Sequence, residues 1–414
     1  MPTLIRPFAG LRPVAGRAAD VAAPPYDVLN SAEARERAQG KPYSFLHISK
    51  PEIDLPADIH PYAPAVYAKA AENLAKLRAE GVLVQDDQAC YYVYQLQMGE
   101  HVQTGLVAAA SVADYDTNRI RKHEFTRPDK EDDRVRQIDA LNAQTGPVLL
   151  AYRSDPAVDG ILAQAATAAP EVDIVADDGI AHRIWVIRDA AVIADITRRF
   201  DAMPALYIAD GHHRSASASR IAAARKAANP HHTGAEAYNY FLSVIFPHEQ
   251  MRILDYNRVV KDLHGRSGAE FLAAIAAAFT VEPSAAQARP AQRGEFGMYL
   301  DGKWYRLTIK PERVPDDPVA RLDVSLLQAN LLEPLLGIQD PRRDARIDFV
   351  GGIRGLSELE KRVNSGEMQV AFALYATPMQ DLMAVADAGE VMPPKSTWFE
   401  PKLADGLVSH LLDA

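Results

Sequence analysis

The chain has 414 residues, of which 48% are hydrophobic, 24% charged and 7% aromatic. This composition is typical of soluble globular proteins and excludes a largely disordered or fibrous chain, and the length predicts two or three domains. Lysine and arginine number 45 against 55 aspartate and glutamate, so the net charge is −10. An acidic chain of this kind is not expected to bind nucleic acid or an anionic membrane, although a local basic pocket for phosphate remains compatible with it.

Cysteine content and hydropathy indicate a cytoplasmic protein. Cys90 is the single cysteine and cannot form an internal disulfide, which fits a reducing compartment. No stretch reaches the roughly 18 to 20 apolar residues that cross a bilayer. The proline- and arginine-containing N-terminus lacks the apolar core of a secretory signal. We therefore expect cytoplasmic localisation and no membrane partner.

The predicted elements begin after an irregular segment, residues 1–50, whose paired prolines disfavour helix. Apolar residues at helical spacing then predict a helix over 66–77, ended by Gly81. Strands are expected at 90–94, 106–109, 147–150, 184–187, 205–208, 240–246, 298–300, 304–307 and 370–374, and helices at 215–228, 271–279 and 324–332. This mixed order without a regular βαβ rhythm predicts an α+β (mixed α/β) fold.

A tract rich in alanine, proline and glutamine, residues 283–295, is typical of a linker or long loop. It suggests a division into two regions. Residues 1–282 would form a mixed α/β region that carries the main motifs. Residues 283–414 would form an α+β region that closes the same site.

Four common catalytic motifs are absent from the sequence. It contains no G-x-x-x-x-G-K-[ST] phosphate loop, no G-x-G-x-x-G dinucleotide turn, no G-x-S-x-G nucleophile elbow and no H-E-x-x-H zinc helix. Any active site must therefore be of a less common kind.

The strongest local signal is the stretch Asp210, Gly211, His212, His213 and Arg214, which joins a predicted strand to a predicted helix. A glycine turn at a helix N-terminus presents amides to an anion, and an arginine fork matches phosphate oxygens. The aspartate at the strand end is suited to holding magnesium or accepting a proton. The alternative is a turn whose aspartate caps the helix and whose histidines are ordinary surface residues.

A second signal is the charged stretch 123–134. Lys130, Arg134 and Arg127 are candidates for binding phosphate, and Glu124 is a candidate base or metal ligand. The alternative is the solvated start of a charged helix.

The third signal is the proline-rich stretch 392–402 near the end of the sequence. Its Lys395, Ser396 and Thr397 follow two prolines and offer an ammonium group and two hydroxyls to a phosphate. An ordinary proline-rich surface turn is the alternative.

Together these segments resemble a conserved family whose function is undefined. The family is recognised by R-P-F, A-P-P-Y-D-V, S-F-L-H-I, H-E-x-T with K-E-D-x-R, A-D-G-H-H-R and M-P-P-K-S-T-x-F-x-P-K. In this sequence the motifs occupy residues 6–8, 23–28, 44–48, 123–134, 209–214 and 392–402. They occur in order along nearly the whole chain.

The D-G-H-H-R turn also resembles that of free serine kinases of the ParB/sulfiredoxin superfamily. This resemblance covers Asp210 to Arg214 only. It implies a ParB/sulfiredoxin-like strand–turn–helix core and phosphorylation of free L-serine to O-phosphoserine. The implied phosphoryl donor is ATP, ADP or pyrophosphate.

From chemistry we expect one electropositive cleft in which the three segments converge, because phosphoryl transfer depends on positioning and charge neutralisation. The donor would be bound by Gly211, His213, Arg214, Lys130, Arg134, Lys395, Ser396 and Thr397. Asp210 or Glu124 would accept the hydroxyl proton, Asp210 would hold a magnesium ion, and His212 would orient the transferred group. Two other functions remain open, namely a nucleotide-binding ParB-like regulator and a phosphatase or nucleotide hydrolase.

Overall fold

The computed structural model describes residues 3–412, which divide into two compact units. Unit 1 comprises Met1–Met251 and Pro401–Ala414, and unit 2 comprises Arg252–Glu400. Unit 2 is thus inserted into the chain of unit 1. The boundary differs from the one expected at residue 283, because Pro283 lies opposite Tyr305 in a paired strand of unit 2.

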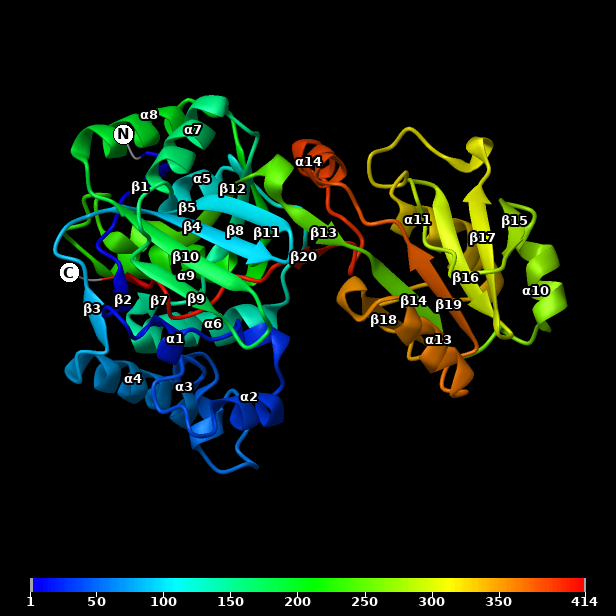
Figure 1. Cartoon of the computed structure of the whole chain (residues 1–414), viewed down its shortest axis with the longest axis horizontal. Helices are drawn as coiled ribbons and strands as arrows, with labels where there is room; N and C mark the ends of the chain where they lie inside the picture. Colours follow the sequence, from blue (N-terminus) through cyan, green and yellow to red (C-terminus); the bar gives the residue numbers. More distant parts are fainter. Residues whose placement is uncertain (1–2, 413–414) are drawn as a thin grey trace. The chain divides into compact units, whose positions relative to one another are not determined.

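A mixed sheet forms the centre of unit 1 (Figure 1). In spatial order its strands are β6 (Ile120–Arg121), β11 (Leu206–Asp210), β8 (Val148–Tyr152), β12 (Tyr240–Pro247), β5 (His101–Ser111), β4 (Tyr91–Met98), β10 (Ala181–Ile187) and β9 (Val172–Val175), and β1 (Ile5–Arg6) also pairs with β5. Short two-stranded pairs join β2 (Leu11–Pro13) to β3 (Leu83–Gln85) and β7 (Ala143–Gln144) to β21 (His410–Leu411).

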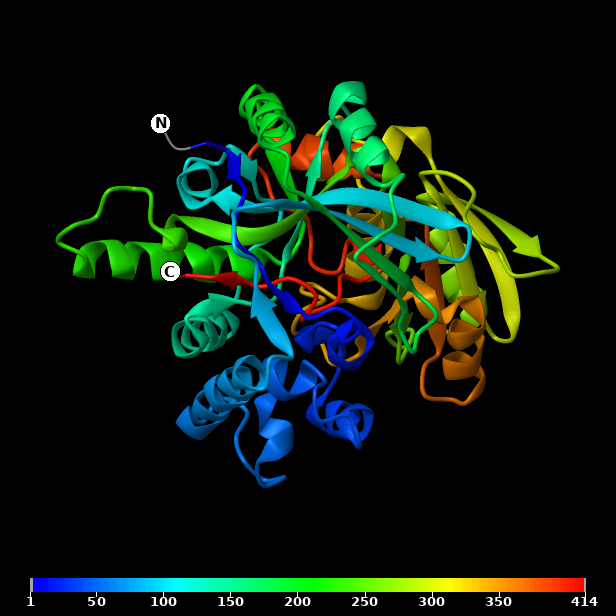
Figure 2. The ribbon, with the colours of Figure 1, turned by 60° about the vertical axis from the view of Figure 1, so that its left-hand side comes forward.

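Helices cover this sheet and extend beyond it. They are α1 (Ala18–Val21), α2 (Ser31–Ala38), α3 (Leu46–Ser49), α4 (Pro64–Ala79), α5 (Val112–Asp116), α6 (Pro128–Leu141), α7 (Pro156–Ala165), α8 (Ala190–Asp201) and α9 (His212–Ala228). Side chains of α7, α8 and α9 share the main core with the sheet, whereas α2, α3 and α4 build a separate core around Phe45 and Leu74. Figure 2 shows these N-terminal helices, in blue, grouped together away from the sheet.

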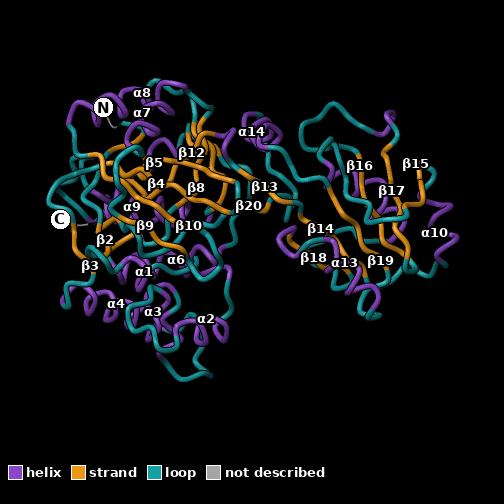
Figure 3. The backbone as a smooth tube through the Cα atoms, viewed as in Figure 1, coloured by secondary structure: helices purple, strands orange, loops and turns teal. Residues whose placement is uncertain are grey.

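Unit 2 is built on a second, antiparallel sheet (Figure 3). Its strands in spatial order are β15 (Phe279–Ser284), β17 (Lys303–Ile309), β16 (Glu295–Leu300), β19 (Val370–Leu374), β14 (Tyr256–Val260) and β18 (Ile347–Gly351). Its helices are α10 (Gly268–Ile275), α11 (Asp323–Leu327), α12 (Glu333–Leu336), α13 (Leu356–Asn364) and α14 (Met379–Asp387). A two-stranded ribbon of β13 (Arg252–Leu254) and β20 (Trp398–Glu400) pairs the two ends of the unit.

The mixed α/β fold class is confirmed. Gly99 turns the hairpin between β4 and β5, and Asp301 with Gly302 turns the one between β16 and β17; all three residues have positive φ. Three expectations about helices are wrong. The segment expected to be irregular contains α2, because Asn30 caps it and Glu33 completes a capping box. The helix expected over 271–279 starts and ends earlier, since Ser267 caps α10 and Phe279 already pairs in β15.

The expected helix over 324–332 is not a single α-helix. It consists of α11 followed by a π-helical turn at Gln328–Leu332. Within residues 3–412, every helix is too short or too polar to cross a bilayer.

Candidate active site

The edge of the unit 1 sheet brings two of the predicted segments together. Strands β6 and β11 run parallel and pair through Ile120 and Leu206. Parallel strands end at the same edge of a sheet. The residues that follow β6, His123 and Glu124, therefore lie beside His212, which follows β11.

Gly211 makes the turn between β11 and α9. Its φ is +97°, a conformation that favours glycine, and a Cβ placed on it would lie 3.3 Å from the Cα of Val148. Gly211 is itself the N-cap of α9, and no side chain caps the helix. The structure therefore shows no capping of α9 by Asp210, and the amides of Arg214 and Ser215 donate to the backbone oxygen of Gly211 at 2.9 and 3.1 Å.

Asp210 instead forms an ion pair with the C-terminal segment. Lys402 Nζ lies 3.0 Å from Asp210 Oδ2. Burial alone would raise the pKa of Asp210, but the charges of Lys402 and Arg214 outweigh it and lower the pKa to about 2. Asp210 is consequently ionised at neutral pH.

Arg214 points from the first turn of α9 into the protein, and its side chain is only 10% exposed. It donates to the carbonyl oxygen of Pro147 at 2.8 Å and to Asp27 Oδ2 at 3.2 Å. Its buried Nε has no hydrogen-bond partner. Although burial opposes ionisation, the negative charges led by Asp27 raise the pKa of Arg214, so the guanidinium remains charged.

Arg134, on α6, contacts the same aromatic ring as Arg214, that of Tyr26. Its guanidinium carbon lies 3.8 Å from the centre of the Tyr26 ring, and that of Arg214 lies 5.4 Å from the same ring. Arg134 also donates to Asp133 at 2.7 Å, which holds the guanidinium in place. Two arginines from different helices thus face one aromatic ring.

A small cavity of about 30 Å³ lies between these groups. Both arginines line it, together with Tyr26 and Asp405. Asp405 is 2% exposed, and its Oδ1 has no hydrogen-bond partner. Burial raises the pKa of Asp405 to about 7, although the nearby Arg214 opposes the shift. The cavity is therefore lined by two permanently charged arginines and by Asp405, a carboxyl group whose pKa lies near neutrality.

The histidines that follow β6 and β11 are uncharged at neutral pH, and of these His123 and His212 are buried and His213 is half-buried. The rings of His123 and His212 meet edge to face, with their centres 4.4 Å apart. Burial lowers the pKa of His123 to about 4 and takes the pKa of His212 well below its ordinary value. Burial also lowers the pKa of His213, whose Nε2 accepts from the backbone of Arg127 at 3.0 Å.

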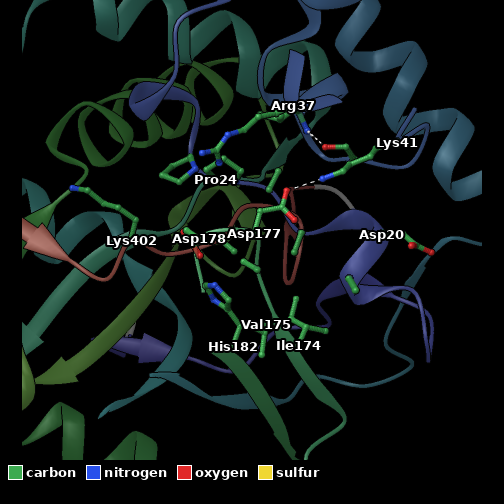
Figure 4. A pocket seen from close by; sticks show the side chains of 18 of the residues that line it. Asp20, Pro24, Arg37, Lys41, Ile174, Val175, Asp177, Asp178, His182 and Lys402 are labelled. Atoms are coloured by element: carbon green, nitrogen blue, oxygen red, sulfur yellow. Dashed lines mark hydrogen bonds and ion pairs between the residues drawn. The ribbon is translucent and has the colours of Figure 1, made fainter. Parts of the chain in front are cut away.

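A second, larger cavity of about 100 Å³ has Lys402 in its lining (Figure 4). Its lining carries both signs of charge, including Arg37 and Lys41 on one side and Asp177 and Asp178 on the other. Lys41 and Asp177 pair with each other at 2.7 Å. A cavity of mixed charge is suited to a small zwitterion.

Not all of the predicted residues reach the cavity between the arginines. Lys130 donates to the hydroxyl of Tyr62 at 2.7 Å. Lys395, Ser396 and Thr397 belong to unit 2, where the backbone oxygen of Lys395 accepts from Arg258 at 3.1 Å. Their convergence with Arg214 stays a prediction.

Sequence reasoning missed several residues of this site. Asp27, Lys402 and Asp405 were not among the candidates, although Asp27 and Lys402 lie inside motifs that were recognised. Their importance comes from pairing with Arg214 and Asp210 across the fold. The residue spacing around His123 gives no sign of His212, because the two lie 89 residues apart and meet only in the fold.

Comparisons with known proteins found one matching family model and several solved structures with a remote likeness. A family model described as "Protein of unknown function (DUF1015)" matches residues 5–325. No curated protein matches the chain.

Three solved structures show a remote likeness. A free serine kinase variant in complex with ADP is 14% identical with a TM-score of 0.35, and 74% of this chain and 94% of that chain are covered. A conserved hypothetical protein from Pyrococcus furiosus is 15% identical with a TM-score of 0.36, and the coverages are 73% and 94%. SbnI with a C-terminal truncation, from Staphylococcus aureus, is 11% identical with a TM-score of 0.31, and the coverages are 73% and 86%.

Proposed function

The chain belongs to the DUF1015 family of proteins of unknown function, and we propose that this member is a phosphotransferase acting on a small hydroxyl compound. The observation that carries the proposal is the pair of arginines, Arg134 and Arg214, that face one cavity beside the uncapped N-terminus of α9. Fixed cations and helix amides are the groups that stabilise a transferring phosphoryl group.

The donor's phosphates would contact Arg214 first. Its guanidinium is planar and always charged, and its Nε has no protein partner, so it can donate to a phosphate oxygen. Asp27 would compete with phosphate for the same guanidinium. ATP, ADP and pyrophosphate all present phosphates that this arrangement can bind, with the amides after Gly211 as additional donors.

We propose free L-serine as the acceptor, with O-phosphoserine as the product. The mixed-charge cavity lined by Lys41 and Asp178 offers partners for both the ammonium and the carboxylate of an amino acid. In the reaction the serine hydroxyl oxygen bonds to phosphorus and the bond to the donor's bridging oxygen breaks. Asp210 or Glu124 would accept the hydroxyl proton, and His212 would orient the transferred group.

A divalent ion is compatible with this site. Asp210 is ionised and is the residue that would hold magnesium, which commonly takes one or two protein carboxylates together with phosphate oxygens. Such an ion would supply further positive charge to the phosphates. Lys402, paired with Asp210, supplies part of the same charge from the chain itself.

The test is to incubate the purified protein with magnesium, a pool of free amino acids and, in separate reactions, ATP, ADP or pyrophosphate. Formation of O-phosphoserine, followed by phosphorus NMR and mass spectrometry, supports the proposal. Release of inorganic phosphate without a phosphorylated amino acid would indicate a hydrolase. Nucleotide binding without turnover would indicate a regulator, and either of these results would overturn the kinase assignment.

A further inference from the structure

We propose that His123, Glu124 and His212 bind one divalent first-row transition-metal ion. This site is distinct from any magnesium held with the donor at Asp210. It goes beyond the proposed phosphotransfer and does not depend on it, because it concerns metal binding by the chain alone.

The three side chains already lie close enough to share an ion. One ligand atom from each residue falls within 4.8 Å of the others. Metal–nitrogen and metal–oxygen bonds of roughly 2.0 to 2.2 Å place tetrahedral ligands about 3.4 Å apart. Small side-chain rotations would bring the three ligand atoms to that separation. Nδ1 of His212 lies 3.8 Å from Oε2 of Glu124, which is too far for a hydrogen bond and close to a ligand–ligand separation.

The two ring nitrogens of His212 face different neighbours. Nε2 lies 3.4 Å from the backbone nitrogen of His123, beyond the usual length of a hydrogen bond. Nδ1 is directed toward Glu124, 3.8 Å from its Oε2. Only an unprotonated nitrogen coordinates a metal, so binding through Nδ1 would place the imidazole proton on Nε2 and replace this long contact.

His123 supplies the independent observation that points to a ligand. Its side chain is 2% exposed, and neither ring nitrogen reaches a partner with good hydrogen-bond geometry, although the backbone of Ile208 interacts with the ring. Buried polar groups in native proteins are nearly always paired, so an unpaired one calls for an unseen water or ion. By contrast, the equally buried His182 donates to or accepts from the hydroxyl of Tyr94 at 2.7 Å.

The ligand types select the class of metal. Two imidazoles and one carboxylate suit zinc, iron, manganese or cobalt, whereas magnesium prefers oxygen ligands alone. Three protein ligands leave a coordination position open. With an ion bound, Glu124 would be a ligand, and Asp210 would remain as the proton acceptor in the proposed reaction.

The experiment uses the full chain, without a histidine tag, stripped of metal by chelator dialysis. Cobalt(II) is titrated and followed by its visible absorption, and zinc(II) binding is measured by calorimetry, both without nucleotide. We expect one equivalent of each metal to bind. Glu124→Gln should weaken zinc binding at least tenfold without disturbing the fold, because Glu124 is exposed. His123→Gln should abolish it, and the matched control His182→Gln should bind zinc like the wild type.

A wild-type protein that binds neither metal would overturn the proposal, as would equal zinc affinity in Glu124→Gln and the wild type. Should His123→Gln fail to fold, Glu124→Gln decides alone. Phosphotransferase activity is assayed separately. Loss of that activity with intact zinc binding would reject only the proposed function, and absent zinc binding with intact activity would reject only this metal site.

Discussion

Buried charge dominates the site at the scale of single residues. Arg134 and Arg214 bring two cations into the interior, and Asp133 and Asp27 pair with them. Asp405 faces both arginines without a hydrogen-bonded partner on its Oδ1. In this pocket the aspartates offset the charges of the two arginines. When Asp405 is protonated, the arginines retain positive charge with which an anion can pair.

Replacing Arg214 by lysine keeps the charge and removes the fork that binds two oxygens. We expect ADP or pyrophosphate affinity to fall at least about tenfold, which is about 1.4 kcal/mol, with an unchanged circular dichroism spectrum. Calorimetric titration measures the affinity. Arg225→Lys is the matched control, because Arg225 lies on the same helix and pairs with Asp139. Equal losses in both variants would contradict a phosphate role for Arg214.

Asp405 predicts a pH dependence of stability. Its pKa is raised from 3.8 to about 7 in the folded protein. The folded chain therefore holds a proton that the unfolded chain releases, so this residue destabilises the protein progressively as pH rises from about 4 to 7. Asp405→Asn should remove this loss. The free energy of unfolding of the variant, minus that of the wild type, should therefore be up to about 3 kcal/mol larger at pH 8 than at pH 5.

Urea unfolding at pH 5 and pH 8 measures this effect. The difference between the two proteins should shrink as pH falls through 7. A constant difference at both pH values would show that Asp405 titrates at its ordinary value.

At the scale of elements, the β11–Gly211–α9 unit fixes the geometry of the site. The turn presents uncapped amides beside Arg214 because Gly211 takes positive φ and approaches β8 closely. Alanine at such a position costs about 1 to 3 kcal/mol. Here it would also meet the backbone of Val148.

Gly211→Ala should therefore lose donor binding as well as stability. Gly234→Ala is the control that separates the loss of stability from the loss of donor binding. Gly234 has φ +90° and nothing within 4 Å of an added Cβ. Both variants should lose stability in thermal unfolding, Gly211→Ala the more of the two because of its contact with Val148. Only Gly211→Ala should lose binding of ADP or pyrophosphate, and preserved binding in that variant would contradict the role given to the turn.

Local elements were predictable from the sequence, and long-range pairings were not. The strand, turn and helix around Gly211 follow from neighbouring residues, as do the hairpins at Gly99 and Asp301. The capping box of Asn30 and Glu33 is also a local pattern, and it predicts the start of α2. By contrast, Lys402 meets Asp210 across 192 residues. Such pairs arise from tertiary packing, which residue spacing does not encode.

At the scale of the whole molecule, unit 1 is a discontinuous structure completed by its last segment. Residues after Pro401 return to unit 1, where Asp405 bridges to Ala23 and Ser409 bridges to Leu11. Leu407 and Leu412 are buried there. The segment contributes core packing as well as the charges of Lys402 and Asp405.

Truncation after Glu400 should therefore destabilise unit 1 by several kcal/mol, since it removes buried apolar side chains and backbone pairing together. Unit 2 retains all of its own residues. Calorimetric unfolding should show loss or a large downward shift of one transition while the other persists. Truncation after Leu412 is the control and should leave both transitions in place.

The insertion also sets an order of events during synthesis. Translation runs from the N-terminal toward the C-terminal end of a chain, so Arg214 and the Gly211 turn leave the exit tunnel long before Lys402 and Asp405. All of unit 2 is translated in between. Until then Asp210 lacks its ammonium partner and the cavity lacks one wall. A nascent chain that ends before Lys402 would carry the whole D-G-H-H-R turn without the ion-pair partner of Asp210, so this arrangement would form only after residues 402–405 have left the ribosome.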